Sequence, residues 1–235
     1  MSTAYKRLSV ADFLALEQSA DQRHEFYDGE VFAMAGGTVW HSLITANVSA
    51  ELRAALKKRG CLTLSSDIMV ACPSGLRTYP DVTVVCERPE FEGDRQVTLL
   101  NPQAIVEVLS ESTEAYDRGK KFEHYRGVAS LREYLLVSQD YRHIEHFTRQ
   151  ADGQWLLRMH GDDPGGHVGG KRDGKAGDAE PPIHLSLPTL GCTLSLDEVY
   201  AGVEFPPPKP EPFAAEQPPA AEAPPRRPGP PRLDG

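Results

Sequence analysis

The sequence of 235 residues is short of cysteine, of positive charge and of long apolar runs. Its four cysteines lie far apart and form no CxxC pair, which indicates small buried residues in a reducing compartment and not a zinc site or a disulfide framework. There are 34 acidic residues and 25 basic ones, giving a formal net charge of -9. This balance argues against a protein that coats nucleic acid electrostatically, although it is compatible with a local basic groove.

The chain also lacks the apolar segments of a membrane protein. No run of 18 apolar residues occurs, and the first ten residues contain no apolar signal core. We therefore expect a cytoplasmic protein with no membrane partner. Hydrophobic residues make up 40% of the chain and charged residues 25%, which are ordinary values for a globular protein with a buried core.

Glycine and proline are concentrated in two segments. Residues 160–182 include seven glycines and almost no apolar residue, which is typical of a flexible surface insertion. Residues 206–235 include 12 prolines, a composition from which no core can form. We predict one domain over residues 1–205 and a disordered proline-rich tail. An inert tail is the favoured interpretation, and a tail that binds a partner through its PxxP-like runs is the alternative.

Hydrophobic periodicity predicts both strands and helices. An Asp28-Gly29 pair between short apolar runs predicts a hairpin over residues 23–34. Residues 41–59 predict a helix, because an apolar residue recurs at every fourth position. Its basic end, residues 57–59, suits the helix dipole, and a DNA contact is the weaker alternative. Further strands are predicted at 62–71, 82–85, 103–110, 133–137, 143–148 and 155–159, and a further helix at 114–126.

Glu107 lies inside the most apolar of these strands. Removing a carboxylate from water there costs several kcal/mol unless a cation or hydrogen-bond donors meet it. Asp81 begins the preceding buried strand, so adjacent strands would bring the two carboxylates close together, where they repel each other without a cation. Two carboxylates that leave open positions for water are a common way to hold Mg²⁺. Glu25, on the early hairpin, could complete the ligand set directly or through water.

A lysine on the following helix could supply the remaining chemistry. Asp117, Lys121 and Tyr125 are spaced by four and share one helical face, while Lys120 is rotated away from it. An ammonium near a metal-bound water can position that water and stabilise negative charge on a phosphate. The set of acids and lysine therefore points to phosphodiester hydrolysis.

Simpler explanations exist for each of these residues. Asp81 follows a proline and could be a turn residue, and Glu107 could form a structural ion pair with Arg118 or Lys121. Asp117 and Lys121 could be an ordinary pair on a solvated helix face. His41 is more readily explained as a residue at the start of a helix than as a ligand, so it and Tyr125 are second-choice site residues.

Taken in order, these motifs resemble the Uma-type family of restriction endonucleases in the PD-(D/E)XK nuclease superfamily. The resemblance extends over about residues 7–202 and rests on His41 and on residues 25–30, 79–82, 105–110, 112–113, 117–121 and 133–134. It implies a restriction-endonuclease-like α/β fold, in which a mixed β-sheet is flanked by helices. It also implies DNA cleavage that depends on Mg²⁺, with Mn²⁺ as a second candidate.

The resemblance assigns roles to individual residues. Asp81 matches the motif aspartate, Glu107 the second metal-binding acid and Glu25 the early acid of the family. The superfamily pattern places a lysine two residues after the second acid, but that position here is Leu109. The family's lysine is displaced to the next helix, where Lys121 matches it, with Lys120 as the neighbouring alternative.

Two classes of function follow from the sequence. The first is a metal-dependent endonuclease acting on duplex or branched DNA, with a homodimer suited to cutting both strands. An RNase or a DNA-repair resolvase would share the chemistry and differ only in substrate. The second is a catalytically inactive nuclease fold that binds DNA or protein.

Overall fold

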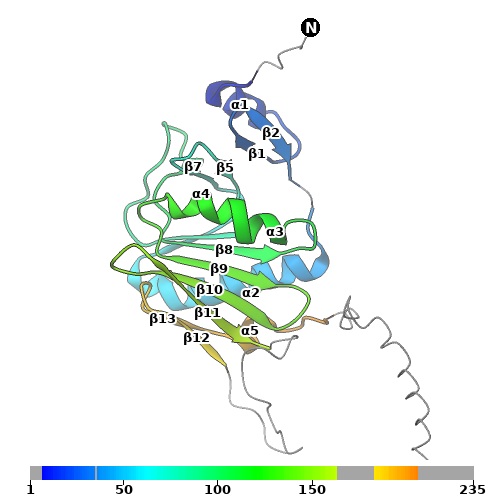
Figure 1. Ribbon diagram of the computed structural model, residues 1–235, viewed down its shortest axis with the longest axis vertical. Helices are drawn as coiled ribbons and strands as arrows, with labels where there is room; N and C mark the ends of the chain where they lie inside the picture. Colours follow the sequence, from blue (N-terminus) through cyan, green and yellow to red (C-terminus); the bar gives the residue numbers. More distant parts are fainter. Residues whose placement is uncertain (1–6, 35, 163–182, 206–235) are drawn as a thin grey trace, which may run out of the picture.

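The computed structural model describes residues 7–34, 36–162 and 183–205 (Figure 1). The proline-rich tail and most of the predicted insertion lie outside these ranges, so the expectations for them stay predictions. The described chain begins with helix α1 (Val10–Glu17), which Ser9 starts with a capping box involving Asp12. Strands β1 (His24–Tyr27) and β2 (Glu30–Ala33) then form the predicted hairpin, whose turn has positive φ at both Asp28 and Gly29.

A six-stranded mixed sheet lies at the centre of the molecule, in the order β11-β10-β9-β8-β6-β3. Its strands are β3 (Leu62–Ser65), β6 (Val82–Val85), β8 (Ala104–Leu109), β9 (Glu133–Ser138), β10 (His143–Arg149) and β11 (Trp155–Gly161). Only β8 and β9 pair in parallel among them, and both are buried along their whole length. This matches their near-continuous apolar sequences, because parallel strands are usually covered on both faces.

A second sheet of five short strands has the order β2-β1-β5-β4-β7. It adds β4 (Met69–Ala71), β5 (Arg77–Thr78) and β7 (Thr98–Leu99) to the hairpin. The predicted strand region 62–71 is therefore two strands that belong to different sheets. The hairpin and α1 lie at one end of the molecule in Figure 1, beyond the helices α3 and α4.

Helices cover the central sheet. The four buried residues of α2 (Val39–Leu56) belong to one core cluster with strands β6, β8 and β9 and with the elements that follow the insertion; they are Ile44, Val48, Leu52 and Leu56. These are β12 (His184–Leu187), β13 (Cys192–Ser195) and α5 (Leu196–Val199). The 3-10 turn η1 (Lys57–Arg59) ends α2, and Gly60 follows it with φ of 78°, which confirms the predicted end of this helix.

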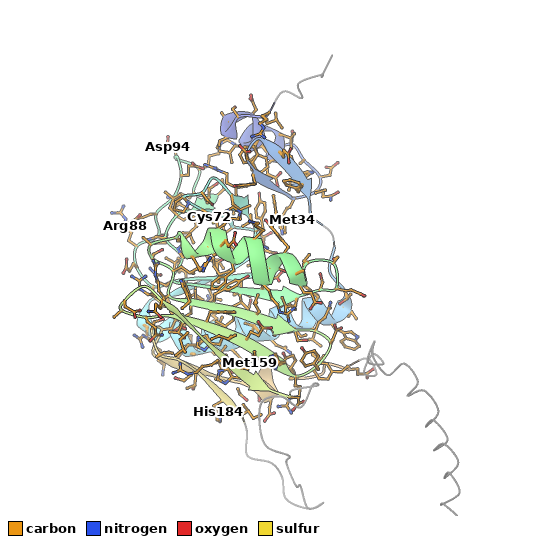
Figure 2. The ribbon with its side chains drawn as sticks, viewed as in Figure 1. Met34, Cys72, Arg88, Asp94, Met159 and His184 are labelled. Carbon is orange, nitrogen blue, oxygen red and sulfur yellow. A yellow bond between two sulfur atoms is a disulfide. The ribbon has the colours of Figure 1, made fainter. Side chains whose placement is uncertain are left out.

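The other face of the sheet is covered by the predicted helix 114–126. It consists of α3 (Glu114–Tyr116), the π-helical turn η2 (Asp117–Lys121) and α4 (Phe122–Arg126). The Phe122 ring stacks on that of Tyr134 in β9 with 4.8 Å between centroids. Side chains fill the space between these helices and the sheet (Figure 2).

Two sequence predictions need correction. Cys61 and Cys86 form a disulfide, so the prediction of cysteines in a reduced state is wrong for this pair. The antiparallel pairing of β3 with β6 aligns Leu62 with Val85, so the next residues outward face each other, with Cα atoms 3.9 Å apart. In addition, β11 runs to Gly161, two residues into the segment assigned to the insertion.

Cys72 and Cys192 are free. Within the described ranges, no helix is long and apolar enough to cross a membrane.

Candidate active site

The structure brings the four predicted site residues to one cavity of about 1030 Å³, lined by Glu25, Asp81, Glu107 and Lys121. They come from β1, from the residue before β6, from β8 and from η2. Strands β6 and β8 are neighbours, as predicted, and pair Val82 with Val106, which sets Asp81 beside Glu107. Met34, the residue after β2, also lines this cavity and is labelled in Figure 2.

Lys121 lies among three carboxylates. Its Nζ is 2.9 Å from Glu107 Oε1 and 3.3 Å from both Glu25 Oε1 and Asp117 Oδ1, and the residue is only 5% exposed. Burial lowers the pKa of Lys121, but the charges of Glu107, Asp117 and Glu25 outweigh it and hold this pKa well above its usual value. Lys121 is therefore a permanent positive charge in the cavity, and it is the protein's own counter-charge for Glu107.

Arg118, the other suggested partner of Glu107, points elsewhere. Its guanidinium pairs with Glu145 at 2.8 Å and with Glu114 at 2.7 Å.

Glu107 is 4% exposed and keeps a hydrogen bond from Tyr125, whose hydroxyl donates to Oε1 at 2.7 Å. Burial raises the pKa of Glu107 to about 8, and the charges of Asp117 and Asp81 add to the increase against the opposing effect of Lys121. The upward shift reflects mainly the loss of hydration around Glu107, which the ammonium of Lys121 and the hydrogen bond from Tyr125 do not fully offset.

Asp81 is fixed by two contacts to its Oδ2. The backbone N–H of Val108 donates to it at 2.7 Å, and His41 Nε2 lies 3.2 Å away. Burial lowers the pKa of His41, but the hydrogen bond and the charge of Asp81 outweigh this effect, so the pKa of His41 is raised above its ordinary value. His41 is thus both a residue of the first turn of α2, whose N–H donates to Thr38, and a part of the site.

Two further groups complete the acidic cluster. The hydroxyl of Thr78 donates a hydrogen bond to the carboxylate of Glu25, which lies in β1, and fixes the position of this side chain. Asp117 is 2% exposed, and its Oδ1 has no hydrogen-bond partner among the described residues although it lies near Lys121. Burial raises the pKa of Asp117 despite the charge of Lys121. The simpler alternative of a solvated pair between Asp117 and Lys121 does not apply, because both side chains are buried. The spacing of four was the only sequence signal for Asp117.

The two neighbouring lysines have different environments. Lys120 Nζ pairs with Glu123 at 3.1 Å on the surface, where the lysine side chain is 74% exposed. It does not line the cavity, whereas Lys121 does.

The donors of the cluster are chemically suited to a hard divalent cation, since Glu25, Asp81, Glu107 and Asp117 offer only carboxylate oxygens. Burial raises the pKa of both Glu107 and Asp117 despite the charge of Lys121, so a further cation in the cavity would stabilise their ionised forms. As the side chains stand, no three acidic, histidine or cysteine groups of the described residues are arranged as the ligands of one ion. Lys121 instead contacts three of the four carboxylates.

The remaining lining of the cavity was not predicted from the sequence. Its aromatic members come from widely separated positions and, apart from Tyr79 in the motif 79–82, nothing in their sequence context marks them. They are Phe32, Trp40, Tyr79, Tyr116 and Phe205.

Comparisons with known proteins agree with this arrangement of elements. The family Uma2, described as "Putative restriction endonuclease", matches residues 10–166. Two Synechocystis proteins are similar: the uncharacterized protein sll1609 is 37% identical over 153 residues, 65% of this chain and 86% of its own. The uncharacterized protein slr1290 is 32% identical over 205 residues, 87% of this chain and 97% of its own.

A solved structure shares the fold. The crystal structure of a "putative nuclease" from Anabaena variabilis covers 82% of this chain and 97% of its own, with a TM-score of 0.61 and 16% identity. The predicted fold class, a mixed sheet flanked by helices in a single domain, is confirmed. Because the family match spans well over half of the sequence, the chain belongs to the Uma2 family of restriction-endonuclease-like proteins.

Proposed function

We propose that this protein is a divalent-metal-dependent endonuclease that hydrolyses phosphodiester bonds in DNA. The observation that carries the proposal is the convergence of Glu25, Asp81, Glu107 and Lys121 in one cavity, although three different strand regions and a helix supply them. Family membership and the shared fold support the same reaction class.

The acids are the groups that would hold the ion. Asp81 and Glu107, with Glu25, would bind Mg²⁺, or Mn²⁺ in its place, and the bound ion would lower the pKa of a water ligand and offset charge on the phosphate. The protein fixes two of these carboxylates beforehand. The Val108 N–H holds Asp81, and the Tyr125 hydroxyl holds Glu107, so little rearrangement of these groups is needed.

Lys121 acts on the reacting atoms. Its ammonium orients the attacking water and donates hydrogen bonds to phosphate oxygens as their negative charge develops. The attacking water gives up a proton to solvent as its oxygen bonds to phosphorus. The bond from phosphorus to the leaving oxygen breaks, and the leaving oxygen takes up a proton from solvent. Because its pKa is raised, Lys121 stays charged and serves as a positioning and charge-stabilising group, not as a base.

Cleavage assays test this assignment directly. The full-length protein is incubated with supercoiled plasmid and with labelled oligonucleotides in Mg²⁺ or Mn²⁺. We expect Asp81→Asn and Glu107→Gln to lower the cleavage rate by at least about 100-fold, as removal of one transition-state contact often does. Lys121→Ala should lose activity comparably, while the matched Lys120→Ala variant should cleave like the wild type.

Absence of cleavage of any substrate by the wild type would contradict the proposal, as would equal cleavage by the Asp81 and Glu107 variants. Loss of activity in Lys120→Ala with retention in Lys121→Ala would reassign the lysine.

One observation favours the alternative of a catalytically inactive nuclease fold that binds DNA or protein. Lys121 already contacts three carboxylates, so the cluster could persist as a structural ion network without metal. The two functions differ in their response to Mg²⁺. A metal that binds only the folded state stabilises it by about 2.7 kcal/mol at 100 times its Kd, so the melting temperature should rise on adding Mg²⁺.

The rise in melting temperature should disappear in Glu107→Gln and persist in Lys120→Ala. If the wild type shows no rise at saturating Mg²⁺ or Mn²⁺, the binding-module alternative is favoured and the metal assignment fails.

A further inference from the structure

One wall of the active-site cavity is aromatic and apolar. Phe32 in β2 is 48% exposed, and it lines the cavity together with Trp40, Tyr116 and Phe205. Trp40 lies in the first turn of α2, immediately before His41, whose ring contacts Asp81. The same helical turn therefore carries an aromatic surface and a contact to the acidic cluster.

The cavity is acidic, whereas protein surfaces that bind the DNA backbone are basic. Its lining carries seven carboxylates, those of Glu25, Asp81, Glu107, Glu111, Asp117, Asp140 and Glu204. Among the lining residues that the structure describes, only Lys121 and His41 can carry positive charge. Duplex-binding proteins gain affinity by neutralising many phosphates with lysine and arginine, and this cavity has no row of such side chains.

The reacting groups are also recessed. The side chains of Glu107 and Lys121 are 5% and 6% exposed, and that of Asp81 is 18% exposed. The cavity of about 1030 Å³ is at the upper end of the sizes that hold small ligands, roughly 300–1,000 Å³. A paired helix keeps its bases stacked inside, whereas an unpaired strand can turn a base outward into a pocket and bring the adjoining phosphate with it.

Aromatic faces beside a recessed site are a suitable surface for such a base, since every nucleobase can stack on them whatever its sequence. We propose that the cavity binds an unpaired base stacked on Trp40, with Phe32 and Tyr116 nearby, and that the protein acts on single-stranded or unpaired nucleic acid in preference to intact duplex. This inference rests on the proposed nuclease function, whose substrate class it narrows.

Binding measured separately from cleavage tests the inference. The probe is a labelled single DNA strand of about 12 nucleotides, within the length that one single-strand-binding site covers. The same sequence as a blunt duplex is the comparison, and both are titrated with full-length protein in Ca²⁺ by fluorescence anisotropy. We expect the single strand to bind at least about tenfold more tightly, because only its bases are free to stack.

Variants locate the stacking surface. Trp40→Ala should weaken single-strand binding by about 5- to 100-fold, the usual effect of removing a base-stacking aromatic, and Phe32→Ala should weaken it less. Trp40→Phe should retain most of the affinity. That result would show that binding depends on an aromatic face at this position, because this variant keeps one and Trp40→Ala does not. Tyr27→Ala removes an aromatic side chain that is 40% exposed but does not line the cavity, and it should bind like the wild type.

Intrinsic fluorescence gives an independent signal, because the chain has two tryptophans, Trp40 and Trp155. Stacking on Trp40 should quench emission in the wild type and in Trp155→Phe but not in Trp40→Phe. Affinity should also depend weakly on salt. With at most two cationic contacts, log Kobs against log salt should have a slope of about -0.7 to -1.4.

The outcomes separate this inference from the proposed function. Equal or tighter binding of the duplex, a steep salt slope, or unchanged binding by folded Trp40→Ala would overturn the inference, even if the enzyme cleaves plasmid. Tight, Trp40-dependent binding of the single strand without any cleavage in Mg²⁺ would uphold the inference and refute the nuclease assignment.

Discussion

Lys121 illustrates how much a single side chain determines in this protein. Its ammonium lies within 3.3 Å of oxygens from Glu25, Glu107 and Asp117, which belong to three different elements. Two buried carboxylates and a partly buried one with no cation would repel one another strongly in a medium of low dielectric constant. The lysine therefore has a structural part in holding the cluster together as well as the catalytic part proposed for it.

A second residue gives the folded state a dependence on pH. His160 in β11 is partly buried, and its Nε2 has no hydrogen-bond partner among the described residues. Burial, with the nearby His146, Arg158 and His143, lowers the pKa of His160 to about 4, from an ordinary value of 6.5. Below pH 6.5 the unfolded chain therefore takes up a proton that the folded chain accepts only near pH 4.

We predict that this histidine makes the free energy of unfolding fall as the pH decreases from about 6.5 to about 4. His160→Gln should reduce the loss over that window, while His184→Gln, at an exposed position in β12, should leave it unchanged. Urea unfolding at a series of pH values measures the effect. Parallel stability curves for wild type and His160→Gln would contradict the prediction.

At the scale of elements, the helix over residues 114–126 is interrupted by a π-helical turn at the point where it meets the cavity. The turn η2 spans Asp117–Lys121, and both end residues are buried against the site. Single π-turns within α-helices are often found at functional sites, because they alter which side chains face a given direction. Here the turn lies between a partly exposed α3 and an α4 whose Phe122 and Tyr125 enter the core.

Gly119, in the middle of η2, permits a test of this segment. A Cβ added there would meet nothing within 4 Å, and the residue has no positive φ. Gly119→Ala should therefore stabilise the protein by about 0.5–1 kcal/mol, chiefly by restricting the unfolded chain. The matched Gly161→Ala should destabilise it, because Gly161 has φ of +104° and its added Cβ would lie 2.0 Å from the Arg142 carbonyl oxygen.

Urea denaturation of both glycine variants gives the comparison. Destabilisation by Gly119→Ala would show that the π-turn depends on the freedom of glycine at this position.

At the scale of the whole molecule, the site depends on the contact between the two sheets. Glu25 belongs to the five-stranded sheet and Glu107 to the six-stranded sheet. The hairpin that carries Glu25 joins the rest of its sheet through the pairing of Phe26 with Arg77 in β5. Small movements of the hairpin would therefore change the distance between Glu25 and Lys121, and with it the shape of the cluster.

The disulfide between Cys61 and Cys86 constrains the central sheet at this scale. It closes a loop with a sequence separation of 25, for which the chain-entropy model gives a stabilisation of about 3.5 kcal/mol. A reducing agent, or Cys61→Ser with Cys86→Ser, should lower the free energy of unfolding by about this amount. Urea denaturation measures the change. Thiol titration of the unreduced, denatured protein should detect Cys72 and Cys192 alone, and detection of all four thiols would refute the bridge.

Much of the local structure could be predicted because it depends on neighbouring residues. The hairpin follows from the Asp28-Gly29 pair, and the end of α2 follows from its basic residues 57–59 and the glycine after them. The apolar runs predicted β6 and β8 correctly, and with them the closeness of Asp81 and Glu107. Two features could not be predicted in this way: the register in which β9 pairs with β10, and the end of β11 at Gly161. Both depend on strand pairing, which periodicity does not specify.

The sequence by itself determined that a carboxylate would be buried in an apolar strand and would need compensation, since the cost of desolvating Glu107 holds in any fold that buries this strand. Only the tertiary structure decided which groups compensate it, namely Lys121 and Tyr125 from the helix face, and it brought a further acid, Glu25, from another sheet to the same lysine. It also decided that Cys61 bonds to Cys86 and that His41 contacts Asp81. These contacts join residues far apart in the chain, and they depend on how strands pair and helices pack, which no spacing within one segment encodes.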